Sequence, residues 1–336
     1  MNETNGSTRL PVRHLEVTPD QAGQRIDNFL VAHLKGVPRS HVYRLLRRGE
    51  VRVNQGRVGP EYRICAGDRV RLPPVRQSVP SAPTRPSTHL LDIMQGCILH
   101  EDNHLLVLNK PSGLAVHGGS GLRFGAIEVL RVLRPNAPCM ELVHRLDRDT
   151  SGLLMVAKRR SVLRHLHALL RDGGVDKRYL ALVRGTWRSG THQVDAPLLT
   201  NHLQSGERMV CVDATGKASV TRFTSLSKQT PIQTVATPPA ASLVEAKPLT
   251  GRTHQIRVHA AHTGHPVAGD EKYGDPVFNR LARGWGLHRL FLHAHRLQFE
   301  EDGQVLSLEA PLDKDLQRVL TALHPSGGIG ERGVNP

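Results

Sequence analysis

The sequence predicts an α+β protein with a small domain followed by a larger one. Short apolar runs typical of strands alternate with helical patterns over residues 91–323, which favours an internal mixed sheet. Residues 73–90 are rich in proline, serine and threonine and poor in apolar side chains, a composition typical of a linker. We therefore expect domains at residues 14–72 and 91–323, and a disordered tail at residues 324–336.

The composition excludes several classes of protein. The chain has 336 residues, 38% of them hydrophobic, and contains no apolar run of the ~18 residues that a membrane helix needs. Residues 1–12 are polar, lack the apolar stretch of a secretory signal, and are expected to be disordered. Scattered cysteines make a disulfide scaffold or a cysteine zinc site unexpected and fit a reducing cytoplasm. The four cysteines are Cys65, Cys97, Cys139 and Cys211.

The charge points to a polyanionic partner. Lys and Arg number 45 against 30 Asp and Glu, a net charge of +15. Binding to nucleic acid releases counterions from its phosphates, so such a protein is attracted to RNA or DNA. A basic balance is also compatible with solubility alone or with a membrane surface, and the motifs must decide.

Two helices are expected in the small domain. Residues 23–34 place apolar side chains on one face, and a second helix is expected to begin at Ser40 as its N-cap and to stop at Gly49. Residues 51–54 alternate like a strand. The second helix carries a run of arginines without a carboxylate. These arginines are Arg39, Arg44, Arg47 and Arg48. A solvated helix face usually mixes the two signs of charge, so we expect this one to contact RNA or DNA.

The small domain resembles the alpha-L RNA-binding motif of a small-subunit ribosomal protein and of several RNA-modifying enzymes. The matching pieces are GQRIDNFL (23–30), VPRSHVYRLLRRGEVRVN (37–54) and AGDRVRLP (66–73).

In the large domain, strands are expected at residues 105–108, 153–157 and 179–183, and a helix at residues 161–171. Residues 225–243, rich in Ser, Thr, Gln, Pro and Ala, are expected to form a flexible hairpin insertion.

The segment HRLDRDTSGLL, residues 144–154, is the first candidate for chemistry. It places Arg145, Asp147, Arg148 and Asp149 within five residues of a polar loop. One interpretation is a turn in which Asp and Thr bond to their own backbone. The other is an aspartate that serves as nucleophile or base and is kept ionised by flanking cations.

The segment GRTHQIRVHAAHTGHPVAGDEKYG, residues 251–274, is the second candidate. Thr253 can cap a helix on which His254 and Arg257 are neighbours on one face. The spacing of its four histidines does not place four metal ligands on one face, and no H-E-x-x-H pattern occurs, so we expect surface or phosphate-facing histidines and no metal. Tyr179, beside Asp176 and two basic residues, is either a core aromatic or part of the site.

The ordered set of motifs resembles the RluA-type pseudouridine synthases, most of all those acting on the large ribosomal subunit. HRLDRDTSG is the specific signature, with LNKPSGLAVHGGSG (108–121) before it and KRYLALVRG (177–185), LQSGERMV (203–210) and KPLTGRTHQIRVHAAHTGHPVAGDEKYGD (247–275) after it. The resemblance covers some 300 residues and implies a catalytic domain with a mixed, largely antiparallel sheet.

The resemblance also implies roles. Asp147 would be the essential nucleophile or base, Arg257 would pair with it and orient it, and Tyr179 would lie beside the uracil and assist removal of the C5 proton. Arg145 would fill the space that the extruded uridine leaves in the RNA, or hold the rearranged RNA. Asp149 is expected to brace the loop. The reaction would need no cofactor.

Relatives of this architecture modify uridines of 23S ribosomal RNA, including the peptidyl-transferase region, and some act on transfer RNA. We therefore expect a cytoplasmic, monomeric isomerase acting on 23S RNA or on large-subunit assembly intermediates. The alternatives are a synthase for transfer RNA, a non-catalytic ribosome-assembly factor that clamps RNA, and a metal-dependent RNA hydrolase.

Overall fold

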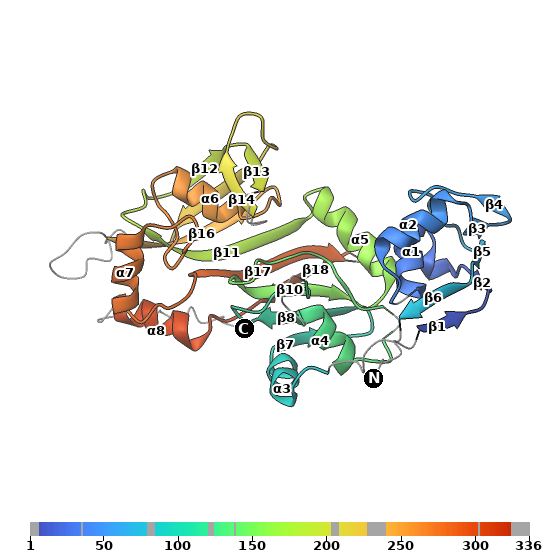
Figure 1. Cartoon of the computed structure of the whole chain (residues 1–336). Coiled ribbons are helices and arrows are strands. Elements are labelled where there is room, and N and C mark those ends of the chain that lie inside the picture. The colour runs from blue at the N-terminus through green and yellow to red at the C-terminus, as the bar shows by residue number, and fades with distance from the viewer. Residues whose placement is uncertain are drawn as a thin grey trace, which may run out of the picture. The chain divides into compact units, whose positions relative to one another are not determined.

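The computed structural model describes residues 7–34, 36–78, 85–119, 124–137, 139–202, 208–226, 240–301 and 303–323. The chain divides into two compact units, residues up to Pro86 with Arg159–Ser161, and the remainder (Figure 1). Among the described residues, no helix is long and apolar enough to pass through a bilayer. The expected tail and residues 227–239 of the expected insertion lie outside the described residues.

The first unit packs two helices on a four-stranded sheet of order β2-β5-β3-β4. Its elements are β1 (Ser7–Leu10), β2 (Arg13–Glu16), a 3-10 turn (Pro19–Gln21), α1 (Ile26–His33), α2 (Arg39–Arg47), β3 (Arg52–Val53), β4 (Gly56–Arg57), β5 (Arg69–Leu72) and β6 (Val75–Ser78). Phe29, Leu30 and Val42 join the two helices in one core. Asp27 also links them, because its carboxylate accepts hydrogen bonds from Arg25 and from the Tyr43 hydroxyl.

Three expectations for this part of the chain were wrong. Helix α2 begins at Arg39 with Pro38 as its N-cap, so Ser40 lies inside the helix. Residues 7–10 pair with residues 75–78 as an antiparallel ribbon, so the disorder expected for residues 1–12 does not hold at residues 7–10, and strand structure extends into the segment expected to be a linker. At the other end of the expected linker, α3 already begins at Thr88, where the Ser87 hydroxyl accepts a hydrogen bond from the Leu90 backbone.

The second unit is built on a ten-stranded sheet. Its main strand order is β12-β15-β16-β11-β17-β10-β8-β7, with β18 beside β17 and β9 beside β10. Among the strand pairs formed by the described residues of this sheet, only β10–β17 is parallel, so the sheet is mixed and largely antiparallel, as the sequence predicts. The strands are β7 (Ile98–Glu101), β8 (Leu105–Lys110), β9 (Glu141–Leu142), β10 (Ser151–Ala157), β11 (Val175–Arg184), β12 (Thr191–Asp195), β15 (Val220–Ser225), β16 (Ala241–Pro248), β17 (Leu292–Glu301) and β18 (Gln304–Glu309).

Helices and one separate hairpin surround this sheet. They are α3 (Thr88–Gly96), α4 (Ala126–Leu133), α5 (Arg160–Arg171), the hairpin β13 (Leu198–His202) and β14 (Arg208–Val212), α6 (Gln255–His262), α7 (Pro276–Gly284) and α8 (Lys314–Leu323). Helices α3, α4 and α5 share a core with β8 and β10, whereas α6 packs against β11, β15 and β16. The central strands β10, β17 and β11 lie side by side in Figure 1. The pocket described next is lined by residues of β11, β17, α6 and the loop before β10.

Candidate active site

The loop between β9 and β10 holds Asp147 in a fixed backbone. The buried Lys110 ammonium donates hydrogen bonds to three carbonyl oxygens, of Pro111, Leu114 and Arg148, at 2.8, 2.9 and 3.0 Å. Gly152, at the end of the loop, has φ +106°, and a Cβ there would collide with the Ala294 carbonyl of β17. The loop is therefore fixed on the C-terminal side of Asp147, at Arg148 and at Gly152.

Arg257 joins Asp147 to a second carboxylate. Its Nη1 lies 3.3 Å from Asp147 Oδ2, while Nε and Nη2 donate to the two oxygens of Asp270 at 2.7 and 2.8 Å. The Arg257 side chain is 9% exposed and Asp270 1%, whereas Asp147 is 29% exposed. The two carboxylates raise the pKa of Arg257 against the opposing effect of burial. A permanently charged guanidinium is thus held rigidly by Asp270 and presented to Asp147, which still faces the pocket.

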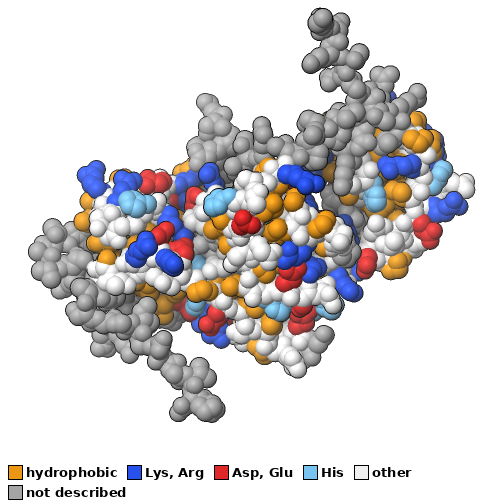
Figure 2. All heavy atoms as spheres, turned by 90° about the horizontal axis from the view of Figure 1, so that it is seen from below, with side chains coloured by type: hydrophobic (Ala, Val, Ile, Leu, Met, Phe, Trp, Pro, Cys, Tyr) orange, Lys and Arg blue, Asp and Glu red, His pale blue; other side chains and the backbone are white. Residues whose placement is uncertain are grey.

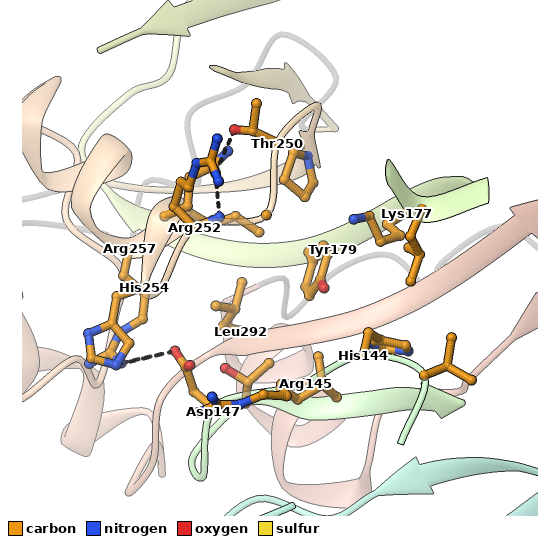
Figure 3. A pocket seen from close by; sticks show the side chains of 18 of the residues that line it. His144, Arg145, Asp147, Lys177, Tyr179, Thr250, Arg252, His254, Arg257 and Leu292 are labelled. Atoms are coloured by element: carbon orange, nitrogen blue, oxygen red, sulfur yellow. Dashed lines mark hydrogen bonds and ion pairs between the residues drawn. The ribbon is translucent and has the colours of Figure 1, made fainter. Parts of the chain in front are cut away.

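His254 approaches Asp147 from the same segment. It is the N-cap of α6 with φ +53°, a left-handed conformation that is uncommon for a side-chain-bearing residue. Its Nε2 lies 3.8 Å from Asp147 Oδ2 (Figure 3). Its Nδ1 lies 2.7 Å from the Tyr273 hydroxyl. That hydroxyl accepts a hydrogen bond from the Val210 backbone, so its own proton can go to Nδ1, which favours a proton on Nε2 facing Asp147. His254, not Thr253 as expected, occupies the cap.

A cavity of about 650 Å³ brings Asp147, Arg257 and Tyr179 together. Tyr179 lies on β11, where the register with β17 shifts between Arg178 and Tyr179. Such a bulge re-aims the following side chain. In Figure 3 the Tyr179 ring stands in the pocket, with its hydroxyl toward the side from which Asp147 and Arg145 project. Burial, and to a lesser extent the Asp147 charge, raise the pKa of Tyr179, so the phenol is neutral at physiological pH.

Three other residues of the signature differ in their environment. His144 accepts a hydrogen bond at Nε2 from the Met155 backbone, and burial together with the nearby Lys177 charge lowers its pKa to about 3, so it is a neutral structural residue. Arg145 is exposed at the pocket. Asp149 is exposed too, and its carboxylate forms no hydrogen bond or ion pair within the described ranges, which leaves its expected bracing role without support; the Ser112 hydroxyl bonds to its backbone carbonyl.

The histidines of residues 251–274 are neither a metal cluster nor uniformly at the surface. No group of three or more His, Cys, Asp or Glu suited to a metal occurs in the part of the chain that the structure describes. His259 is fully buried, with its ring nitrogens bonded to Thr221 Oγ1 and the Ala196 carbonyl at 2.9 and 3.0 Å. The expectation of surface histidines was therefore wrong for His259.

The arginines expected to bind RNA on α2 belong to the first unit. Arg39, Arg44, Arg47 and Arg48 are all exposed. Arg39 donates to Asn28 at 3.3 Å and Arg48 lies 3.8 Å from Glu50, whereas the side chains of Arg44 and Arg47 have no acidic partner among the residues described. Exposed cations without acidic partners are available to phosphates.

Sequence reasoning missed Asp270 and Tyr273. Asp270 follows Arg257 by 13 residues, beyond a turn, so no helical spacing connects them. Tyr273 contacts both His254 and Arg257, whose guanidinium carbon lies 5.1 Å from the ring centroid. The available signal was a carboxylate and an aromatic residue together in GDEKYG, which by itself is equally typical of an exposed turn.

Comparison with known proteins agrees with this geometry. Residues 104–262 match the RNA pseudouridylate synthase family and residues 24–70 match the S4 domain family. The chain is 54% identical over 321 residues to the ribosomal large subunit pseudouridine synthase C of Yersinia pestis, covering 95% of this chain and 98% of that protein. It is 55% identical over 317 residues to the protein of that name from Escherichia coli strain K12, covering 93% and 97%.

Among solved structures, human RNA pseudouridylate synthase domain containing 4 is similar, with a TM-score of 0.57 and 27% identity, covering 70% of this chain and 95% of the human chain. The relatives with more than half of their residues identical span nearly the whole chain, and both family matches fall on the expected domains. This chain therefore belongs to the RluA-type RNA pseudouridine synthases that carry an S4 domain.

Proposed function

We propose that this enzyme isomerises specific uridines of 23S ribosomal RNA, several sites including the peptidyl-transferase region, with Asp147 as nucleophile or base. The observation that carries the proposal is the pocket in which Asp147, Arg257 and Tyr179 converge from three distant segments. The choice of RNA is supported by the two named relatives, which are both called ribosomal large subunit pseudouridine synthase C. This chain matches them along nearly their whole length.

The chemistry of isomerisation explains the pocket. The N1–C1′ bond of uridine breaks, the uracil turns, and C5 bonds to C1′; the proton lost from C5 is balanced by one gained at N1. No atom enters or leaves overall, so the reaction requires no co-substrate. Asp147, as a carboxylate within 3.3 Å of Arg257, supplies the negative charge that begins this exchange.

Arg257 and Tyr179 would serve that carboxylate in different ways. Arg257 is anchored by Asp270 and fixes the orientation of Asp147 during the reaction. Tyr179 offers a flat ring beside the uracil and a hydroxyl that assists removal of the C5 proton. A solvated surface would hold neither the buried ion pair nor the phenol in place.

The uridine must leave its stack before it can enter the pocket. Extrusion costs a few kcal/mol, which contacts to the rest of the RNA must offset. We assign the exposed Arg145 to the space that the base vacates, and the arginines of α2 to backbone contacts that carry no sequence information. The proposed setting is a cytoplasmic monomer acting on 23S RNA or on assembly intermediates.

Mapping pseudouridine in cellular RNA tests the proposal. Carbodiimide-stop sequencing of 23S RNA is compared between cells with and without the protein, with complementation by the wild type and by Asp147→Asn. Defined sites that disappear and return only with the wild type are the expected result. A change confined to transfer RNA would overturn the choice of substrate, and sites restored equally by Asp147→Asn would revive a non-catalytic RNA clamp.

A further inference from the structure

The pocket is electrostatically one-sided in a way that the catalytic residues do not explain. Asp147 is the only carboxylate among its lining residues, against several cations. The basic side chains, which lie beside the neutral His144, are Arg145, His167, Arg171, Lys177, Arg252, His254 and Arg257. By contrast, acidic and basic side chains lie among one another on the face drawn in Figure 2. The positive charge around the pocket is therefore a local property of its wall.

Lys177 is a pocket cation that has no anionic partner among the residues the structure describes. It lies two residues before Tyr179 on β11, and its ammonium projects into the pocket near the Tyr179 ring in Figure 3. It forms no hydrogen bond or ion pair with any residue that the structure describes, whereas the adjacent Asp176 is held 2.9 Å from Lys247 and 3.1 Å from Arg178. Burial lowers the pKa of Lys177, and no carboxylate opposes that effect. A partly desolvated ammonium without an anion is unfavourable, which is typical of a group that a ligand completes.

Helix α5 adds two more donors to the same wall. His167 and Arg171 are exposed and line the pocket that Lys177 lines. The helix contains no acidic residue, and the acid that directly follows it, Asp172, lies 3.7 Å from Arg171 with both side chains more than 70% exposed. The turn after α5 is tight, since the Gly174 backbone donates to the Leu169 carbonyl at 2.8 Å, and the chain enters β11 directly. The end of α5 and the start of β11 thus form one cationic corner.

We propose that this corner, with Lys177 inside and His167 and Arg171 at the rim, binds a phosphate of the RNA strand next to the target uridine. The inference rests on the proposed function, because an extruded uridine brings a phosphodiester on each side to the pocket. A phosphate compensates a partly desolvated ammonium better than a neutral uracil carbonyl does, since two opposite charges interact strongly where water is partly excluded. Lys177 is then a substrate-binding residue that positions the nucleotide while Asp147 and Tyr179 act on the base.

A combined protein and RNA substitution tests this assignment. The RNA is a synthetic stem-loop that carries one uridine identified by mapping, prepared with native linkages or with a single uncharged methylphosphonate 5′ or 3′ of that uridine. Isomerisation is followed by tritium release from [5-³H]uridine for the wild type, Lys177→Met and Lys177→Arg. We expect Lys177→Met to raise KM roughly tenfold to hundredfold with kcat within threefold, and Lys177→Arg to recover most of the loss.

The effect of Lys177→Met on KM and the effect of the methylphosphonate on KM should not be additive. One of the two methylphosphonates should weaken wild-type binding as Lys177→Met does, and the variant should lose nothing further on that RNA. The salt dependence of KM should fall by about one released counterion, a slope change of roughly 0.7–0.9. Lys217→Met, which removes an exposed lysine outside the pocket, is the matched control, and any effect it has should be equal on all three RNAs.

Additive losses on both modified RNAs would overturn the phosphate assignment and turn it toward a uracil carbonyl. A fall in kcat at unchanged KM for Lys177→Met would also overturn the phosphate assignment. The same holds if Lys177→Met and Lys177→Arg both lower the unfolding temperature. Absence of tritium release from the native RNA by the wild type would instead overturn the proposed function itself, so the two failures are distinct.

Discussion

Arginine serves two purposes in this molecule, and α2 and α6 show them separately. On α2, Arg44 and Arg47 are exposed and have no acidic partner among the described residues. On α6, Arg257 is 9% exposed and is held between Asp147 and Asp270. Exposed cations give affinity that salt screens and that depends little on geometry. A buried, bidentate arginine gives fixed geometry that salt hardly reaches.

This contrast assigns binding to one region and positioning to the other. Exposed ion pairs contribute about 0–1 kcal/mol each, whereas breaking a buried pair costs about 3–5 kcal/mol because a charge is left without a partner. Changes on α2 should therefore alter RNA binding and leave folding alone. Changes around Arg257 should alter chemistry and folding together.

The largest expected effect is that of Asp147→Asn. The amide keeps the size of the side chain but cannot serve as nucleophile or base, so turnover of a purified RNA substrate should fall by at least about 10⁴-fold. RNA affinity, measured by filter binding, should stay within a few fold, since the cations of the protein are unchanged. Residual turnover near the wild-type rate would remove Asp147 from the mechanism.

Next in size is Tyr179→Phe. The ring remains beside the uracil and only the hydroxyl is lost, so kcat should fall by about 10²–10⁴-fold, the usual contribution of a general acid or base. KM should change little. Tyr179→Leu, which removes the ring as well, separates the two functions, because it should raise KM in addition. Equal kinetics for the two variants would mean that the ring and not the hydroxyl matters.

Arg257→Lys tests whether geometry or charge is needed at α6. Lysine keeps the positive charge but cannot bond to both Asp270 oxygens and reach Asp147 at once. We expect kcat to fall by about 10–100-fold and the free energy of unfolding by about 2–4 kcal/mol, by urea titration. Asp270→Asn should produce the same pair of effects, and a wild-type kcat in either variant would contradict a positioning role.

Much of this organisation could be predicted from the sequence, for identifiable reasons. The apolar face and the arginines of α2 could be predicted because they depend only on the spacing of residues within one segment of the sequence. Asp147 and Arg257 were found because each lies in a specific motif, although 110 residues separate them. The prediction that they pair is consistent with the 3.3 Å contact; their catalytic roles stay predictions.

The residues that were missed depend on tertiary contacts. Asp270 and Tyr273 gain their importance from the turn that returns the chain to α6, and His259 is buried because the β15 hydroxyl of Thr221 and the Ala196 carbonyl satisfy its ring. The β1–β6 ribbon was missed because its two segments are polar or proline-rich in sequence. Its pairing uses backbone groups and needs no apolar pattern that the sequence would display.

His144 differs from both sets of arginines, because it is a basic side chain that the catalytic domain keeps uncharged. Its pKa is about 3 in the folded protein against 6.5 for a free histidine, so between these values the unfolded chain binds a proton that the native state does not. Stability should therefore fall as the pH drops from 6.5 toward 3, by up to about 1.4 kcal/mol per pH unit from this group. His144→Gln, which can still accept from Met155, should make the unfolding free energy less dependent on pH. An unchanged slope would show that His144 is protonated in the native state.

The smallest expected effect per residue is on α2. Arg44→Gln with Arg47→Gln should raise KM for the RNA by about tenfold at physiological salt and reduce the slope of log KM against log salt by about 1.4–1.8 for two phosphate contacts. The kcat and the unfolding free energy should stay unchanged, because neither side chain has an acidic partner within the residues described. Lys217→Gln, at an exposed position outside both α2 and the pocket, is the control, and Arg39→Gln should raise KM less than Arg44→Gln or Arg47→Gln because its side chain already donates to Asn28. A double variant that lowers kcat at saturating RNA would show that α2 also positions the substrate, and the separation between binding and positioning arginines would fail.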